Sequence, residues 1–308
     1  MKGRIIKSAN NIYTLSSLLD SSICQARIKG KVLDSVKGEY NPLVVGDIVS
    51  YIPNTQGDSM ITEREERATS FARWNVKKLI NQTICANMDQ VVIVSTVSNP
   101  PFRPRFIDRA ICCARNAEIV IAINKDDLEV SPFVSSWCKL YNALGFKCIT
   151  ISAKEKRLDA LIELLKGKTS AFVGQSGCGK SSIVNALLSL NEKTGEIVSK
   201  YDRGRHTTTS STFFYGEEYN IIDTPGVREI LVPLEDESLV KECFPELKDA
   251  TCLYSSCLHY GEEGCAVPEL IDKNIVSPER YESYLRILES LFERRPGYMR
   301  KKANERQK

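Results

Sequence analysis

The chain has 308 residues, 42% of them hydrophobic and 26% charged, which is typical of a globular protein with two or three cores. No stretch approaches the roughly 18 consecutive apolar residues of a membrane span, and the charged start lacks the apolar run of a secretory signal. With 42 Lys and Arg against 39 Asp and Glu, the net charge of +3 is too small to indicate a nucleic-acid binder by itself. The eleven cysteines favour a reducing compartment over a disulfide framework, and we expect a cytoplasmic protein.

The first region, residues 1–75, is predicted to form short β-strands separated by turn residues. The partly alternating segments are 3–15, 22–33, 43–52 and 59–65. Strands of this length and spacing favour a small barrel, although any small β module fits the pattern.

The second region, residues 76–232, alternates apolar strands with helical stretches. The predicted strands are 89–94, 118–123, 146–152, 170–173 and 219–223. The predicted helices are 105–116, 132–144, 158–165 and 180–190. Continuous apolar runs are typical of buried parallel strands, so this region is predicted to be a three-layer α/β domain. The third region, residues 233–308, is predicted to form short helices around a Cys/His cluster, followed by a basic tail.

A phosphate-binding loop is predicted at residues 174–181, where Gly-Gln-Ser-Gly-Cys-Gly-Lys-Ser fits G-x-x-x-x-G-K-[ST]. A strand-like segment precedes the loop and an apolar-faced helix follows it. That context is required, because the backbone N–H groups of the turn wrap phosphate at the helix N-terminus. Lys180 would reach the β- and γ-phosphates and Ser181 would bind Mg²⁺. The alternative is a glycine-rich turn without a ligand.

Guanine recognition is predicted at Asn124-Lys125-Asp126-Asp127, which fits N-K-x-D directly after a strand. The carboxylate of Asp127 can accept two N–H groups of guanine, a donor pair that adenine lacks. Residues 152–154, Ser-Ala-Lys, follow the next strand, and the Ala153 N–H could meet the guanine oxygen. Each motif alone could be a charged loop, but ligands bind where consecutive strands of an open α/β sheet end.

Residues 223–226, Asp-Thr-Pro-Gly, fit D-x-x-G after another apolar strand. Asp223 would hold Mg²⁺ through water, and the Gly226 N–H would contact the γ-phosphate. Upstream, residues 204–209 read Gly-Arg-His-Thr-Thr-Thr, a polar stretch typical of a switch loop, in which Thr208 or a neighbouring threonine such as Thr207 would complete the Mg²⁺ shell.

The motifs stand in an unusual order, because the base motifs precede the phosphate loop, the threonine stretch and D-x-x-G. Together with the β-rich start and the Cys/His end, this order resembles the ribosome small-subunit-dependent GTPase A family over nearly the whole chain. The resemblance implies an N-terminal OB-fold (1–75), a circularly permuted P-loop GTPase domain (76–232) and a C-terminal zinc-binding helical domain (233–308). It also implies late maturation of the small ribosomal subunit, with slow GTP hydrolysis that the subunit stimulates.

The residues predicted to bind GTP and Mg²⁺ are Asn124, Lys125, Asp127, Ser152, Ala153, Lys154, Gly174, Gln175, Ser176, Gly177, Cys178, Gly179, Lys180, Ser181, Ser182, Thr207, Thr208, Asp223 and Gly226. Because Cys178 lies within the phosphate loop, a thiol reagent is expected to block nucleotide binding there.

Catalysis is assigned to Lys180 and His206. Val227 follows D-x-x-G, where Ras-like GTPases carry a water-positioning Gln, and an apolar side chain cannot orient water. His206 is similar to the proposed catalytic His of the family. The alternative is that His206 orders its loop or contacts RNA.

A zinc site is predicted from Cys252, Cys257, His259 and Cys265, four soft ligands within fourteen residues. Four filled positions suggest one closed structural Zn²⁺ ion, and the alternative is a set of reduced, buried cysteines.

The motifs predict GTP and GDP as ligands, and the resemblance implies the small ribosomal subunit and its rRNA as partners. No membrane partner is expected, and a monomer is favoured because no heptad repeat or exposed apolar stripe is evident. The tail, with seven Lys or Arg in residues 294–308, and the β-rich region are the expected RNA contacts. Two alternatives remain: a nucleotide-gated RNA-binding switch with negligible turnover, and a GTPase of another pathway.

Overall fold

The computed structural model describes residues 1–9, 11–28, 40–54, 56–190, 211–227, 229–233, 237–248 and 250–295. The chain forms two compact units, which are interleaved in sequence. The first unit comprises 1–73, 81–102 and 114–229, and the second comprises 74–80, 103–113 and 230–308. The predicted domain boundaries follow chain order, whereas these units do not. Among the described residues, none of the helices combines the length and apolar character that a bilayer crossing requires.

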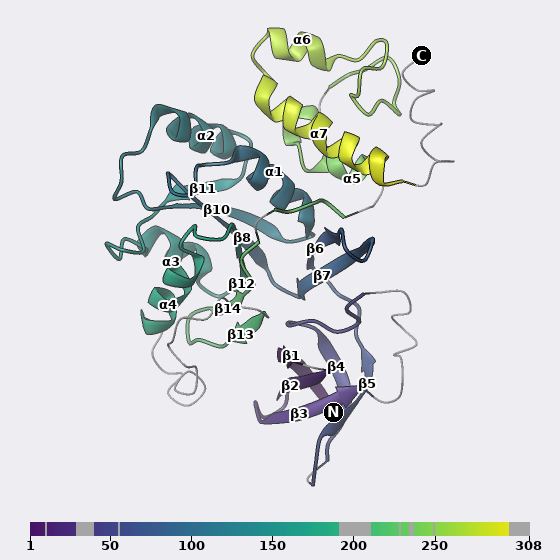
Figure 1. The fold of residues 1–308 in the computed structure, drawn as a ribbon, viewed down its shortest axis with the longest axis vertical. Coiled ribbons are helices and arrows are strands. Elements are labelled where there is room, and N and C mark those ends of the chain that lie inside the picture. The colour runs from purple at the N-terminus through teal and green to yellow at the C-terminus, as the bar shows by residue number, and fades with distance from the viewer. Residues whose placement is uncertain are drawn as a thin grey trace. The chain divides into compact units, whose positions relative to one another are not determined.

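Six strands of the first unit form the sheet that carries the nucleotide motifs (Figure 1). They are β8 (Gln90–Thr96), β10 (Glu118–Asn124), β11 (Lys147–Thr150), β12 (Thr169–Gly174), β13 (Thr212–Phe214) and β14 (Asn220–Asp223). Their order is β11-β10-β8-β12-β14-β13, and the pairings are parallel except for β13 with β14. The predicted α/β domain is therefore confirmed.

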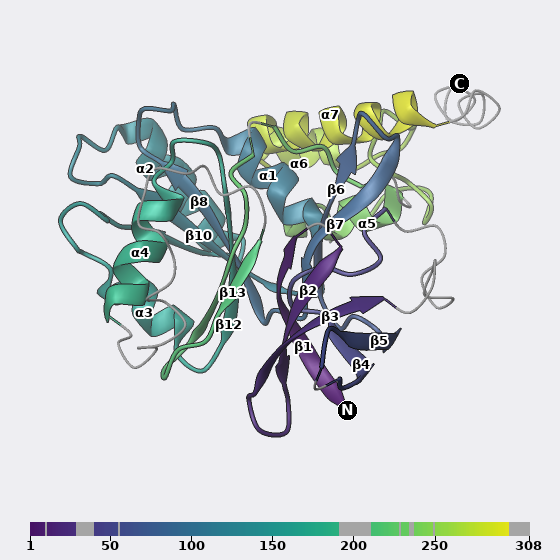
Figure 2. The ribbon, with the colours of Figure 1, turned by 60° about the horizontal axis from the view of Figure 1, so that its bottom comes forward.

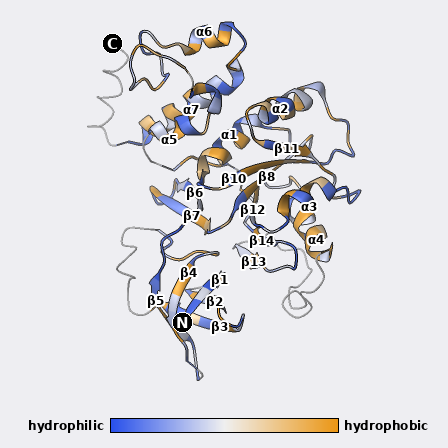
Figure 3. Cartoon of the chain, turned by 180° about the vertical axis from the view of Figure 1, so that it is seen from behind, coloured by the Kyte–Doolittle hydropathy of each residue, from blue (hydrophilic) through white to orange (hydrophobic). Residues whose placement is uncertain are grey.

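The core of this sheet consists of buried hydrophobic residues, and its apolar strands appear orange in Figure 3. Helices α3 (Asp159–Leu165) and α4 (Lys180–Leu190) pack on one face, where Leu161 and Leu187 join Val92 and Phe172 in the core. Helix α2 (Pro132–Ala143) lies on the other face (Figure 2). Strand β8 is buried along its whole length, and its residues 91–94 form a continuous apolar run, which made it recognisable in the sequence.

The N-terminal strands close into a five-stranded barrel. They are β1 (Lys2–Ala9), β2 (Ile12–Ser17), β3 (Ile23–Ile28), β4 (Ile48–Ile52) and β5 (Ser59–Arg64). The pairing runs β1-β2-β3-β5-β4 and returns to β1, with β3 and β5 parallel, as in an OB-fold.

The segment 3–15, which the alternation covered without a break, forms two antiparallel strands rather than one. Asn11 has a φ of +61°, a left-handed conformation that asparagine tolerates better than most residues. In the sequence, the residue pair Asn10-Asn11 was the turn signal that the alternation pattern obscured.

A second sheet contains three strands that the sequence pattern did not indicate. One of them lies at residues 114–115, so the predicted helix 105–116 is wrong at its end and stops at residue 113. The three strands are β6 (Ser70–Asn75), β7 (Ile80–Ala86) and β9 (Ala114–Arg115), in the order β7-β6-β9. Their residues are mostly half-buried and polar, so no apolar run or clean alternation marks them.

The second unit is mainly helical and includes α1 (Pro104–Cys113), which precedes the base motif in sequence. The other elements are α5 (Glu237–Glu242), the short η2 turn (Pro245–Leu247), α6 (Val267–Asp272) and α7 (Pro278–Arg294). Arg280 of α7 is fully buried and donates to Asp108 of α1 at 2.6 Å and to Glu246 of η2 at 2.6 Å. This triad joins α1 to the C-terminal helices.

Candidate nucleotide site and metal cluster

The nucleotide motifs begin where neighbouring parallel strands end. Strand β10 ends at Asn124, β12 at Gly174 and β14 at Asp223, while Ser152 follows β11. Because these strands lie on either side of β8, their carboxyl ends meet along one edge of the sheet. Ligands bind at such an edge in open α/β sheets.

The phosphate loop forms a sharp turn into α4. Gly179 has a φ of +89°, and a Cβ at this position would come within 2.2 Å of the Asn124 amide nitrogen. The loop therefore requires glycine there for backbone conformation and for close approach. Ser176 and Gly177 are exposed at the tip, and Ser181 and Ser182 are exposed in the first turn of α4. Gln175 is buried at the loop's start.

Lys180 and Asp223 form a buried ion pair between the start of α4 and the end of β14. The ammonium group that would bind phosphate and the carboxylate that would hold Mg²⁺ thus lie side by side. A bound nucleotide with its metal would supply both groups with their opposite charges.

Asn124 connects the base motif to the phosphate loop. Its Nδ2 donates to the Cys178 carbonyl at 3.0 Å, and its Oδ1 accepts from the Ala153 N–H at 3.1 Å. Because Asn124 is 2% exposed, this bridge is shielded from water. One side chain therefore sets the spacing among the three loops.

Asp127 is held for hydrogen bonding by its neighbours. Ser152 donates to its Oδ1 at 2.7 Å, and the Lys154 ammonium lies 3.5 Å from its Oδ2. The Ser152 hydrogen bond, assisted by Lys154, lowers the pKa of Asp127 below its ordinary value, so the carboxylate is ionised at neutral pH. An ionised carboxylate can accept both N–H groups of guanine.

Lys125 braces the phosphate loop from the base side. Its ammonium donates to the Gly177 carbonyl at 3.2 Å and also to the Asn99 carbonyl. Sequence reasoning missed Asn99, which precedes a proline in the loop after β8. It also missed Arg157, which pairs with Asp126 across the two base loops. In the sequence, the only indication of this ion pair was that residues of opposite charge lie in or near the two base motifs.

Val227 is attached to the phosphate loop through its backbone. Its N–H donates to the Gly174 carbonyl at 3.2 Å, and its carbonyl accepts from the Ser176 N–H at 3.2 Å. The adjacent Gly226 packs against the same loop, because a Cβ on it would lie 3.6 Å from the Ser176 Cα atom, an ordinary van der Waals distance. The segment after Asp223 is therefore in direct contact with a loop that would hold phosphate.

The thiol of Cys178 packs among the core residues, and the side chain is 1% exposed. Burial raises the pKa of Cys178, which lowers the fraction of reactive thiolate. The expectation that a thiol reagent would block nucleotide binding at Cys178 is not supported by this packing. His206, Thr207 and Thr208 lie outside the described residues.

In the second unit, Cys252, Cys257, His259 and Cys265 form a compact cluster, with all four ligand atoms within 4.8 Å of one another. The Nδ1 atom of His259 lies 3.3, 3.6 and 3.5 Å from the three sulfur atoms, in that chain order. Burial lowers the pKa of His259, which keeps the imidazole neutral and able to bind a metal. The cluster is compatible with a structural metal ion.

Hydrogen bonds fix the loop that carries these ligands. The carboxylate of Glu262 accepts from the N–H groups of Leu258 at 2.8 Å and Tyr260 at 2.6 Å. Tyr281 of α7 donates to the His259 carbonyl at 2.8 Å. His259 has a φ of +56°, and these contacts on both sides hold the loop in that conformation.

Comparison with known proteins agrees with this architecture. The family model described as RsgA GTPase matches residues 64–233. A small ribosomal subunit biogenesis GTPase RsgA of Borreliella burgdorferi is 38% identical over 93% of this chain and 95% of its own length. A protein named small ribosomal subunit biogenesis GTPase RsgA 2, from Bacteroides thetaiotaomicron, is 36% identical over 94% and 96%.

Two solved structures share the fold over almost the whole chain. YjeQ from Thermotoga maritima has a TM-score of 0.71 and 27% identity, covering 96% of this chain and 99% of its own. YloQ, described as a circularly permuted GTPase, has a TM-score of 0.69 and 23% identity, covering 96% of each chain. The chain belongs to the RsgA GTPase family, and its GTPase domain is circularly permuted.

Proposed function

We propose that this GTP-hydrolysing enzyme binds the small ribosomal subunit and hydrolyses GTP to GDP and phosphate during late subunit maturation. The nucleotide would control docking and release, because GTP and GDP differ in the γ-phosphate, which the segments around Asp223 would contact. The names of the relatives support the partner, and the motif chemistry supports the nucleotide. A bacterial cytoplasm is the compartment that fits such a partner.

The observation that carries the nucleotide assignment is the bridge made by Asn124 between the phosphate loop and Ala153. It holds the phosphate-binding and base-binding loops at one fixed spacing, as a nucleoside triphosphate requires. The ionised Asp127 beside it selects guanine, because adenine would leave the carboxylate without its two donors. In this proposal the residues of the three loops bind GTP, and Ser181 and Asp223 hold its Mg²⁺.

The Mg²⁺ ion would neutralise charge that develops on the phosphates during transfer. Lys180 would contribute positive charge at the β- and γ-phosphates, and it would have to exchange its contact with Asp223 for phosphate oxygens. His206 is proposed to orient the attacking water, since Val227 has no polar atom in its side chain. The switch threonines Thr207 and Thr208 are proposed Mg²⁺ ligands.

The Cys/His cluster is proposed to hold one structural Zn²⁺ ion. Zinc binds sulfur at about 2.3 Å and nitrogen at about 2.0–2.1 Å, so a tetrahedral site separates the two by about 3.6 Å. The three distances from His259 Nδ1, 3.3 to 3.6 Å, agree with that value. Four protein ligands leave no open position for substrate, which supports a structural role.

Co-sedimentation tests the proposed partner. The purified protein should pellet with small ribosomal subunits in the presence of a non-hydrolysable GTP analogue and stay in the supernatant with GDP. Large subunits are the matched control. Equal pelleting with both nucleotides, or with both subunits, would contradict nucleotide-gated binding to the small subunit.

The second candidate is a nucleotide-gated RNA-binding switch with negligible turnover. Val227 favours it, because the position that orients water in Ras-like GTPases carries an apolar side chain here, and its backbone is hydrogen-bonded to the phosphate loop. The substitution His206→Ala separates the two. Loss of subunit-stimulated turnover with retained GTP binding supports the enzyme mechanism, whereas turnover that is negligible before the substitution supports the switch.

A further inference from the structure

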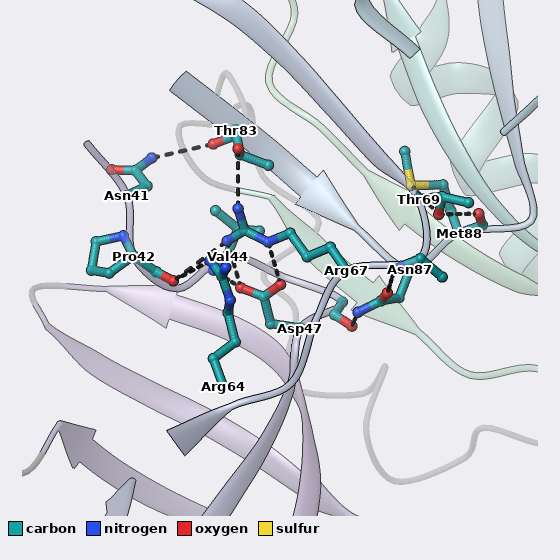
Figure 4. Close-up of polar contacts among 12 residues, drawn as sticks. Asn41, Pro42, Val44, Asp47, Arg64, Arg67, Thr69, Thr83, Asn87 and Met88 are labelled. Carbon is teal, nitrogen blue, oxygen red and sulfur yellow. Dashed lines mark hydrogen bonds and ion pairs between the residues drawn. The ribbon is translucent and has the colours of Figure 1, made fainter. Parts of the chain in front are cut away.

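Asp47 and Arg67 form a nearly buried bidentate ion pair outside the nucleotide site (Figure 4). Arg67 Nε donates to Asp47 Oδ1 at 2.7 Å, and Nη2 donates to Oδ2 at 2.9 Å. The side chain of Asp47 is fully buried and that of Arg67 is 11% exposed. Asp47 lies in the turn before barrel strand β4, and Arg67 lies in the connection from β5 to β6.

The same guanidinium also contacts β7, which lies outside the barrel. Arg67 Nη1 donates to the Thr83 hydroxyl at 3.2 Å (Figure 4). Beside it, the Ala86 N–H donates to the Val45 carbonyl at 3.0 Å. The backbones are so close that a Cβ on Gly46 would lie 1.9 Å from the Ala86 oxygen. The barrel turn is therefore fixed against β7.

The barrel also joins the nucleotide-binding sheet at β13. Lys7 of β1 pairs with Thr212 of β13, and Thr212 in turn lies directly opposite Asp223 of β14. The pairing of β1 with β2 shifts register between Ile5 and Lys7, at the residue of β1 that pairs with β13. One row of cross-strand neighbours thus runs from the barrel to the carboxylate proposed to hold Mg²⁺.

Two further contacts attach β13 to the elements around the ion pair. Ser211, the residue before β13, donates to the Ile84 carbonyl of β7 at 3.3 Å. The Arg4 guanidinium of β1 lies 5.0 Å from the ring centre of the buried Phe213. Strand β13 is therefore attached both to β1 of the barrel and to β7.

A buried ion pair adds little to stability, because transferring its two charges out of water costs about as much free energy as their attraction returns. Its bidentate geometry instead defines one orientation of the joined elements. We infer that Arg67 is a positioning residue: through Asp47 and Thr83 it holds the barrel against β7, so that a partner bound by the barrel can act on β13 and Asp223. This inference rests on the proposed function, in which the small subunit stimulates hydrolysis.

Loss of the ion pair should affect intrinsic GTP turnover and subunit-stimulated GTP turnover differently. GTP turnover by the free protein does not need the barrel alignment, because the contacts of the pair lie with the barrel turn and β7 rather than with the nucleotide loops. Turnover stimulated by the subunit does need it. The double substitution Asp47→Asn with Arg67→Gln removes both charges and keeps an oxygen that can accept from the Val44 N–H, which Asp47 accepts at 2.8 Å.

The experiment measures GTP turnover of the full chain with and without saturating small ribosomal subunits, together with subunit affinity. For the double variant we expect unchanged intrinsic turnover and subunit affinity, and a loss of stimulation by about tenfold, within the usual range for coupling between sites. The substitution Thr83→Val keeps the ion pair and removes only its hydrogen bond to β7. This variant should lose part of the stimulation, and it provides a second test if the double variant folds poorly. The control Lys166→Gln with Glu163→Gln removes an exposed ion pair at the end of α3, outside the barrel.

The control should be stimulated like the wild type. Stimulation of both the double variant and Thr83→Val to the wild-type level would overturn the role of Arg67 and leave the proposed function intact. A wild-type protein that small subunits do not stimulate would overturn the proposed function, and this inference with it.

Discussion

Gly179 and Gly145 have almost the same backbone φ, +89° and +87°, but different surroundings. A Cβ on Gly179 would collide with Asn124, whereas a Cβ on Gly145 would meet no atom within 4 Å. The collision would displace the side chain that holds the phosphate and base loops together. The steric conflict at Gly179 is therefore expected to affect nucleotide binding. Because Gly145 shares the positive φ but has no close neighbour, comparing the two positions separates the steric effect from backbone strain.

We predict that Gly179→Ala weakens GDP binding by roughly 100-fold or more, because small displacements of positioned groups have effects of that size. Gly145→Ala should leave GDP affinity unchanged and destabilise the fold by about 1–2 kcal/mol, the ordinary cost of a left-handed conformation with a Cβ. Titration with a fluorescent GDP analogue and denaturant unfolding measure the two effects. Equal nucleotide affinities for the two variants would contradict the assigned role of Gly179.

The proposed zinc site has a pH dependence whose sign follows from its ligands. Burial raises the pKa of Cys257 to about 12 and also raises that of Cys265, so both thiols carry protons at neutral pH without metal. Burial lowers the pKa of His259, which therefore contributes no proton near pH 7. Metal binding must release at least two protons, so affinity falls as pH falls.

We predict that zinc affinity decreases by about 100-fold or more when the pH is lowered from 8 to 7, because binding releases at least two protons. Competition with a chromogenic chelator measures this slope. Cys257→Ser should lose the bound zinc, and Cys24→Ser, at a cysteine outside the cluster, should keep it. A slope near zero would show that the thiols do not bind the ion.

Helix α7 carries one buried arginine and one half-exposed arginine, each in an ion pair. Arg280 is fully buried, pairs with Asp108 and Glu246, and lies 4.5 Å from the Phe244 ring centre. Arg286, on the same helix, pairs with Glu282 while half of its side chain is exposed. Removal of Arg280 would leave two buried carboxylates without a cation, whereas removal of Arg286 would leave a carboxylate that water already solvates.

We predict that Arg280→Ala lowers the free energy of unfolding by about 3–5 kcal/mol, the usual result of breaking a buried pair. Arg286→Ala should lower it by at most about 1 kcal/mol, as expected for an exposed pair. Urea unfolding followed by circular dichroism compares the two variants. Similar values would mean that the triad between α1, η2 and α7 does not stabilise the second unit.

Elements with strong local signals could be predicted, and elements that depend on distant partners could not. The buried strands β8 and β10 read as apolar runs, and Ser131, which accepts an N–H hydrogen bond at the start of α2, is an ordinary capping residue. Helix α7, with 17 residues, is longer than the short helices predicted for residues 233–308, although Ser277 caps its start in the same way. The strands β6, β7 and β9 lack such a run. The pairing of Arg280 with Asp108 joins residues far apart in sequence, and no local pattern in the chain indicates it.

At the scale of the whole molecule, the order of the motifs was the most informative property of the sequence. It predicted the circularly permuted GTPase domain, and the strand order β11-β10-β8-β12-β14-β13 then placed the motif-bearing strand ends together. What the sequence could not predict is how one unit is assembled from separate segments. The grouping of α1 with the C-terminal helices and the barrel contacts of Asp47 and Arg67 arise from tertiary packing.

Hydrolysis of GTP and ATP by the purified protein, measured with and without small ribosomal subunits, tests both the nucleotide and the partner proposed for this enzyme. We predict slow GTP turnover that rises strongly with small subunits. We also predict a preference for GTP over ATP of roughly 10⁴-fold, because adenine leaves the Asp127 carboxylate without donors. Hydrolysis of ATP at a comparable rate would contradict the role of Asn124 and Asp127, and GTP turnover that small subunits leave unchanged would contradict the proposed partner.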